Sequence, residues 1–219
     1  MEPGLVNLTF HGIGSCPRPL DAGERDVWLG TDELDAVLDR VTDDGAVRIT
    51  FDDGNASDVE HALPALRDRG LRATFFVVAG RLGEPGFLGR DGVRELAAAG
   101  MGIGCHGMEH RPWRGLAPPD LDRELVGAKA MLEELLGAPV RDAACPFGAY
   151  DRRALAALRG AGYERVYTSD GGRADGRAWL QPRNTLRRGG GAAQLDGVGD
   201  ERPAGALLRR AKTAVKRWR

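Results

Sequence analysis

The feature that most constrains the fold of this chain is a regular alternation of short apolar runs with amphipathic stretches. The runs are rich in β-branched and aromatic residues, which favours strands, and the stretches between them repeat apolar residues at helical spacing. We expect strands at 5–10, 46–51, 72–78, 101–106, 140–145, 165–169 and 179–186, and helices at 31–41, 57–70, 91–99, 118–137 and 152–162. Ser57 with Glu60 predicts a capping box, and Asp151 predicts an N-cap. This alternation predicts a parallel sheet buried on both faces, either open or closed into a barrel.

Length, cysteines and the N-terminus indicate the class of protein. At 219 residues the chain is long enough to bury a core as one α/β domain. Its three cysteines, Cys16, Cys105 and Cys145, are scattered and odd in number, so we expect free thiols in a reducing compartment. Residues 1–10 lack a basic segment followed by an apolar one, and no apolar run is long enough to cross a bilayer. We therefore expect a cytoplasmic location.

Charge is distributed unevenly along the chain. The net charge is −1, but residues 207–219 hold six Lys or Arg and no acid, which leaves 25 basic and 32 acidic side chains elsewhere. An acidic body argues against general nucleic-acid binding. Residues 1–187 carry the expected domain, and the Gly-rich stretch 188–205 predicts a flexible link to a tail at 206–219.

The tail has apolar residues at helical spacing with Lys and Arg elsewhere. Such a basic amphipathic helix can lie on an anionic membrane, and a solvated helix end or a disordered tail is the alternative. The apolar positions are Leu207, Leu208, Ala211, Val215 and Trp218.

Polar side chains follow four of the expected strands directly. In parallel α/β folds the carboxyl ends of the strands meet at one edge and form the site there. These groups are His11, the pair Asp52 and Asp53, His106 with His110, and the turn Pro146-Phe147-Gly148.

Asp53, His106 and His110 form a set of two imidazoles and one carboxylate, which suits Zn²⁺ and also non-haem Fe²⁺. The alternative for the histidines is a solvated loop. Of the two acids, one can bind the metal while the other deprotonates water. A simple Asx turn would explain Asp-Gly but not the second acid. His11 is then free to protonate a leaving amine, or else it bonds to backbone.

Three segments resemble motifs of the polysaccharide deacetylases with a NodB-homology domain. They are "TFDDG" at 50–54, "HGMEH" at 106–110 and "CPFGAYD" at 145–151, and the similarity runs from about residue 5 to 187. The resemblance implies a distorted, incomplete (β/α) barrel and a divalent metal, often zinc, that helps to remove acetyl groups from sugars. It also implies that Asp52 is the general base and that Asp53, His106 and His110 are the metal ligands.

The chain departs from the family pattern at three places. Gly107 stands where many members carry Ser or Thr, and Ala144 stands where many carry an Arg that orients the base. Arg183 is our candidate for that Arg. The late Leu-x-His of most members is missing, but "LTFHGIG" resembles the early His of the poly-N-acetylglucosamine deacetylases, which makes His11 the expected acid.

From these residues we predict a metal-dependent hydrolase that removes N-acetyl groups from a glycan or a lipid-linked sugar. A backbone N–H of the Pro146 to Tyr150 stretch is expected to stabilise the oxyanion. Trp113, Phe147 and Tyr150 are candidate sugar-stacking residues, with packing as the alternative. The competing hypotheses are a carbohydrate-binding protein that has lost activity and a hydrolase of another small amide.

Overall fold

The computed structural model describes residues 4–20, 23–42, 44–199, 211 and 213–218. Most of the expected strands and helices are present within two or three residues of their predicted bounds. The strands are β1 Leu5–Phe10, β2 Val47–Phe51, β3 Ala73–Val77, β4 Gly102–Cys105, β5 Asp142–Ala144, β6 Arg165–Thr168, β7 Arg173–Ala174, β8 Leu180–Pro182 and β9 Asn184–Thr185. The α-helices are α1 Thr31–Val41, α2 Leu63–Asp68, α3 Arg90–Ala98, α4 Pro118–Asp122, α5 Ala128–Leu136, α6 Arg152–Gly160 and α7 Ala193–Gly199.

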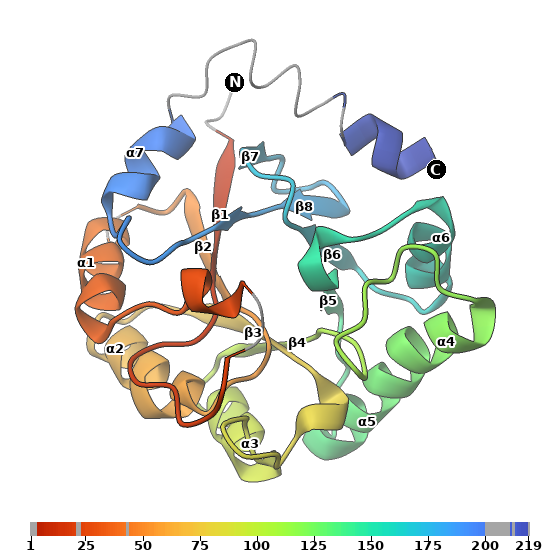
Figure 1. Cartoon of the computed structure of the whole chain (residues 1–219), viewed down its shortest axis with the longest axis horizontal. Coiled ribbons are helices and arrows are strands. Elements are labelled where there is room, and N and C mark those ends of the chain that lie inside the picture. The colour runs from red at the N-terminus through yellow and green to blue at the C-terminus, as the bar shows by residue number, and fades with distance from the viewer. Residues whose placement is uncertain (1–3, 21–22, 43, 200–210, 212, 219) are drawn as a thin grey trace.

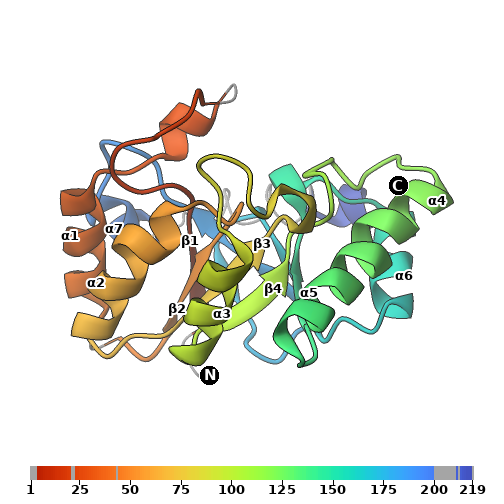
Figure 2. The ribbon, with the colours of Figure 1, turned by 90° about the horizontal axis from the view of Figure 1, so that it is seen from below.

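The strands form one sheet that curls into a nearly closed barrel with helices around it (Figure 1). Strands β1 to β6 are parallel neighbours in chain order, and β8 extends the sheet beside β6. Next along the chain, β9 pairs with β1 at the opposite edge. Seen from the side, α2, α3 and α5 stand next to one another outside the strands (Figure 2). The expected α/β barrel of a single domain is confirmed.

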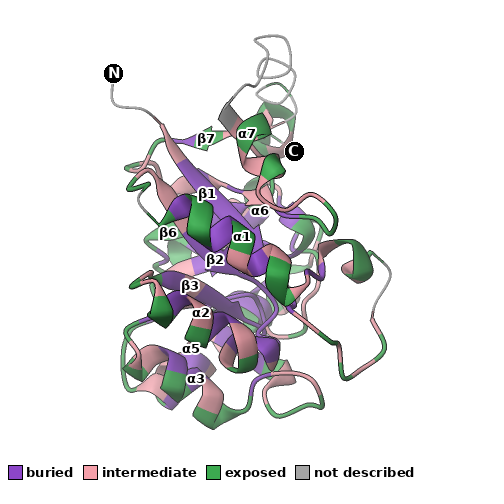
Figure 3. Cartoon of the chain, turned by 90° about the vertical axis from the view of Figure 1, so that its left-hand side faces the viewer, coloured by how far each residue is buried: buried purple, intermediate pink, exposed green. Residues whose placement is uncertain are grey.

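The two faces of the sheet have different cores. Phe10, Phe51 and Phe75 are in register on β1, β2 and β3, and their rings stack at 4.9 and 4.8 Å. They belong to the large core shared with the helices, and the strands and inner helix faces are buried accordingly (Figure 3). Successive residues of a strand point to opposite faces, so Phe76 points the other way, where it packs with Tyr167. That second face lines the interior of the barrel.

The predicted strand 179–186 is in fact two short strands, β8 and β9, separated by Arg183. This break lets one extended segment pair first with β6 and then with β1, so it bridges the gap in the barrel. A further strand, the antiparallel β7, was not predicted because its two residues, Arg173 and Ala174, are too few to show a pattern.

Two predicted caps have different outcomes. Asp151 caps α6, because its Oδ1 accepts a hydrogen bond from the Ala154 N–H at 2.8 Å. Ser57 makes no capping bond and is itself helical. Its hydroxyl instead accepts the Ile13 N–H at 3.1 Å, which ties the loop after β1 to the loop after β2. The predicted capping box at Ser57 is therefore wrong.

Part of the C-terminal region is described, and it contains helical residues. The Gly-rich stretch contains α7, where Asp196 pairs with Arg40 of α1 at 2.8 Å. In the predicted tail, 213–218 are helical, whereas Leu207 and Leu208 lie outside the described residues. Among the helices that are described, none is long and apolar enough to cross a membrane.

Candidate active site

The site lies where β2 and β4 end at the rim of the barrel. Asp52 directly follows β2, and its N–H donates to the Phe10 carbonyl at 3.0 Å, next to His11. His106 directly follows β4, and its N–H donates to the Val77 carbonyl at 2.9 Å. Strand order therefore brings together side chains that are more than fifty residues apart.

The two acids after β2 have separate environments. Asp52 keeps the strand direction, and its carboxylate accepts two hydrogen bonds from Arg183, at 2.6 and 2.7 Å. Asp53 has a positive φ of 77°, which turns the backbone away from the strand. A non-Gly residue in this region carries backbone strain and persists only where its surroundings hold it. Because of this turn, the Asp52 carboxylate faces Arg183, whereas the Asp53 carboxylate faces His106 and His110.

Asp53, His106 and His110 are brought together with ligand atoms that all lie within 4.8 Å of one another. Asp53 Oδ1 is 3.5 Å from His106 Nε2 and 3.2 Å from His110 Nε2. Two ligand atoms that each lie 2.0–2.1 Å from one tetrahedral ion are about 3.3 Å from each other. The two distances from Asp53 Oδ1 to the histidine nitrogens are close to this value. The buried Asp53 Oδ1 has no hydrogen-bond partner, as expected of an oxygen that coordinates a metal ion. The three residues therefore fit a divalent metal.

A hydrogen bond to the backbone orients His106 for metal binding. Its Nδ1–H donates to the Ala144 carbonyl at 2.8 Å, which leaves the Nε2 lone pair facing Asp53. An outer hydrogen bond of this kind fixes the tautomer and orientation of metal-binding histidines. Burial, with a contribution from His110, lowers the pKa of His106 to about 4, so the ring is neutral at pH 7.

The carboxylates stay ionised although both are buried. Burial by itself raises the pKa of Asp52, but the Arg183 charge and hydrogen bonds, with His106 and His11, hold it below its usual value. For Asp53, His110 and His11 likewise outweigh burial and lower the pKa. His11 thus acts electrostatically on both acids. Its own Nδ1 is buried without a hydrogen-bond partner.

Glu124, which the sequence analysis did not identify, supports the loop between the two histidines. It is 1% exposed, and its carboxylate accepts the N–H groups of Met108 and Glu109, both at 3.0 Å. A Cβ on Gly107 would lie 2.3 Å from Glu124 Oε2, so this carboxylate occupies the space that a side chain at 107 would need. A sequence signal existed, because Glu124 shares the apolar helix face of Leu121.

The turn at 146–150 contains one exposed aromatic residue. Phe147 has a positive φ of 56°, is 67% exposed and packs on His110 with ring centroids 4.5 Å apart. Trp113 and Tyr150 are fully buried, and the Tyr150 hydroxyl donates to Asp170 at 2.7 Å. The expectation that Trp113 and Tyr150 stack on a sugar is therefore corrected, because neither offers a free face, whereas Phe147 does.

Comparison with known families decides the identity of this fold and site. The family model for polysaccharide deacetylases matches residues 39–166, which is more than half of the chain. The chain belongs to the polysaccharide deacetylase family. It is 28% identical over 136 residues to the protein named putative polysaccharide deacetylase YxkH of Bacillus subtilis (strain 168), which covers 62% of this chain. The chain spans about half the length of that relative, 49%.

Solved structures of deacetylases share the fold. Streptococcus pyogenes deacetylase PplD, in complex with acetate, superposes with a TM-score of 0.80 and 20% identity over 91% of this chain and 99% of its own. IcaB from Ammonifex degensii gives a TM-score of 0.72 and 24% identity over 90% and 97%. The polysaccharide deacetylase BA0330 from Bacillus anthracis, also described as putative, gives 0.77 and 18% over 90% and 69%.

In this member of the polysaccharide deacetylase family, Arg183 reaches Asp52 from the segment that bridges the barrel. Its guanidinium lies over the rings of Phe76 and Tyr167, 5.2 and 5.8 Å from their centroids. Those rings cluster with Ala144 of β5. The small side chain of Ala144 thus lies in the same cluster as the rings over which Arg183, between β8 and β9, is placed.

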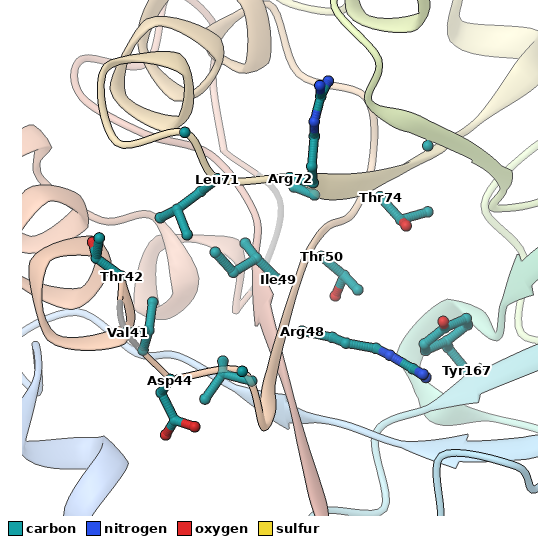
Figure 4. Close-up of a pocket in the computed structure, with 15 residues that line it drawn as sticks. Val41, Thr42, Asp44, Arg48, Ile49, Thr50, Leu71, Arg72, Thr74 and Tyr167 are labelled. Atoms are coloured by element: carbon teal, nitrogen blue, oxygen red, sulfur yellow. The ribbon is translucent and has the colours of Figure 1, made fainter.

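The chain also has a cavity at the other end of its barrel, with a volume of about 460 Å³. It is lined where β2, β3 and β4 begin, by residues such as Arg48 and Thr74, and Tyr167 lies at its side (Figure 4). In barrels of this kind the amino-terminal end serves stability. The cavity is separate from the acids and histidines at the carboxyl ends.

Proposed function

We propose that this chain is a metal-dependent deacetylase that hydrolyses the N-acetyl group of an N-acetylated sugar. The observation that carries this proposal is the pairing of two differently held acids. Asp52 is held by Arg183, and the carboxylate of its neighbour Asp53 lies within 4.8 Å of ligand nitrogens of two histidines. A carbohydrate-binding protein without activity would have no need for both arrangements.

Asp53, His106 and His110 would hold the metal, and we propose Zn²⁺ because it accepts this mixture of nitrogen and oxygen ligands. When bound, such an ion polarises the acetyl carbonyl and lowers the pKa of water. Because His106 is neutral and Asp53 ionised, neither has to lose a proton before the ion binds at neutral pH.

Asp52 is placed to act as the general base. Its carboxylate is ionised, and Arg183 fixes its orientation through both oxygens. His106 Nε2 lies 3.8 Å from Asp52 Oδ2, so a proton accepted by Asp52 is taken up next to the proposed metal ligands. Oriented acid–base groups of this kind typically contribute roughly 10²–10⁴-fold to the rate.

His11 is our proposed general acid. It follows Phe10, whose carbonyl accepts the Asp52 N–H, and its imidazole would protonate the leaving nitrogen. A neutral amine leaves far more readily than an amide anion, and His is suited to this donation near pH 7.

The oxyanion would be stabilised by a backbone N–H of the turn that begins at Pro146. The Gly148 and Ala149 N–H groups donate within the turn, to the carbonyls of Cys145 and Pro146. The N–H groups of Phe147 and Tyr150 are therefore the proposed donors, and the exposed Phe147 ring would border the sugar.

The proposal is tested by measuring acetate release from N-acetylhexosamine oligomers, lipid-linked sugars and nucleotide-linked sugars, with metal-loaded and chelated protein. We expect metal-dependent release from at least one class, and release from the Asp52→Asn protein that is roughly 10²–10⁴-fold slower. Oligomer binding by the metal-loaded chain with no acetate release from any substrate would support the binding protein instead. Release from small amides but not from sugars would support the other hydrolase.

A further inference from the structure

A second cavity lies between the C-terminal helical segment 213–218 and the carboxyl ends of β6 and β8, with a volume of about 300 Å³. The barrel side of this groove includes Thr168, Asp170 and Pro182, and the helix side includes Thr213, Arg217 and Trp218. Thr168 ends β6, and Pro182 ends β8 directly before the Arg183 that holds Asp52. The groove thus opens on the rim of the barrel that carries the acids.

Lys216 anchors the segment to this rim. Its ammonium pairs with Asp170 Oδ1 at 2.7 Å, donates to the Gly148 carbonyl at 3.3 Å and lies 5.4 Å from the centre of the Tyr150 ring. The Asp170 side chain is 7% exposed and also accepts hydrogen bonds from Tyr150 and Thr168. Because Phe147, which packs on His110, belongs to the same turn as Gly148, the anchor connects the segment to the site.

Trp218 gives the groove an aromatic residue available to a ligand. It is 80% exposed, although it lies on the groove, and the polar residues Thr213 and Arg217 line the same cavity. An apolar ring face with neighbouring polar groups is suited to a ligand that combines C–H surface with hydroxyls and amides, as a pyranose does.

We propose that this groove binds a neighbouring sugar unit of the glycan whose N-acetyl group is removed, with Trp218 as the stacking residue. The inference rests on the proposed function, since it extends the same substrate along the rim. A glycan is favoured over a membrane because the groove is a cavity with both polar and apolar lining residues, and because Lys216 ties its helix side to the turn that carries Phe147.

The first test compares a single N-acetylglucosamine with its tetrasaccharide as substrates of the full chain. Trp218→Ala should lower the ratio of kcat/KM for the tetrasaccharide to that for the monosaccharide about tenfold, the effect of about 1.4 kcal/mol of binding. Val215→Ala is the matched control, because Val215 is 50% exposed on the same segment and does not line the groove. An unchanged ratio in Trp218→Ala, or an equal fall in Val215→Ala, would overturn the inference.

The second test needs no turnover. Tetrasaccharide is titrated into the Asp52→Asn chain, and tryptophan fluorescence is followed. Trp28 and Trp113 are buried, and Trp179 is held by an indole N–H bond to the Tyr163 carbonyl with Arg159 over its ring, so the signal of Trp218 is identified as the part of the change that Trp218→Ala removes. A change that Trp218→Ala abolishes supports the groove even if no acetate is released, in which case the proposed function fails alone. Acetate release without a fluorescence change overturns the groove alone.

A third test measures co-sedimentation of the chain with vesicles of phosphatidylcholine and phosphatidylglycerol. If Trp218→Ala abolishes co-sedimentation with these vesicles while the substrate ratio stays unchanged, the segment is a membrane contact and the glycan groove is overturned.

Discussion

The Arg183 guanidinium and the Asp52 carboxylate form a buried two-pronged ion pair, with distances of 2.6 and 2.7 Å and side chains that are 0% and 5% exposed. Fork-to-fork pairs of this type are among the stronger charge-assisted hydrogen bonds and impose a fixed orientation. A buried charge that loses its partner is costly, so the two residues depend on each other.

Replacing Arg183 should change the pH dependence of activity. Its charge lowers the pKa of Asp52, so Arg183→Met raises that pKa, and the base becomes protonated at higher pH than in the wild type. The acid limb of the kcat/KM profile should therefore move to higher pH, with a smaller move for Arg183→Lys. Arg177→Met, at an exposed position, is the control. A limb that does not move would show that Asp52 is not the titrating base.

Asp52→Asn should separate metal binding from turnover. The amide keeps the shape of the side chain but cannot accept the water proton, so turnover should fall roughly 10²–10⁴-fold while metal content stays unchanged. Metal analysis and acetate release on the same sample measure both. Loss of the metal would instead make Asp52 a ligand.

Removal of the metal should abolish acetate release, and Zn²⁺ or Co²⁺ should restore it. Asp53→Ala, His106→Ala and His110→Ala should each lose bound metal, because each removes one of the three clustered ligand atoms. His61→Ala, outside this cluster, should bind metal normally. Full activity after exhaustive chelation would contradict the proposed chemistry.

His11→Ala should retain metal but lower turnover on N-acetyl substrates about 10²-fold or more, the range for lost acid–base help. Activated aryl acetates should be affected much less, because a phenolate leaves without being protonated. Zinc content and turnover on both substrates are compared. Equal slowing of both would mean that His11 only positions the substrate, and loss of zinc would make it a ligand.

Glu124→Ala should weaken metal binding although Glu124 touches no ligand side chain. Without its carboxylate, the N–H groups of Met108 and Glu109 lose their acceptor, and the loop that positions His110 loosens. Loss of such outer support typically lowers metal affinity by about 10–100-fold. Competition with a chromogenic chelator measures the affinity, and Glu134→Ala is the control. Wild-type affinity in Glu124→Ala would remove the supporting role.

The sequence predicted those features that depend on local patterns. The spacing of apolar residues predicted β1 to β6 and the helices around them. The acids and histidines at the ends of the expected strands indicated the three clustered ligand residues. Ser57 was misassigned because its hydroxyl found a tertiary partner, Ile13, that no local pattern reveals. The burial of Trp113 and Tyr150 likewise depends on tertiary packing.

The pairing of β9 with β1 and of β8 with β6 also sets the order in which this chain becomes functional. During synthesis, both acids and both histidines leave the ribosome well before the bridging segment. Until Asn184 and Thr185 reach β1, Arg183 is not held in place, and Asp52 has no guanidinium beside it. A nascent chain ending at residue 179 would carry all three metal-binding candidates but an unpartnered base. Protein synthesis thus delivers the metal-binding residues first and completes the base last.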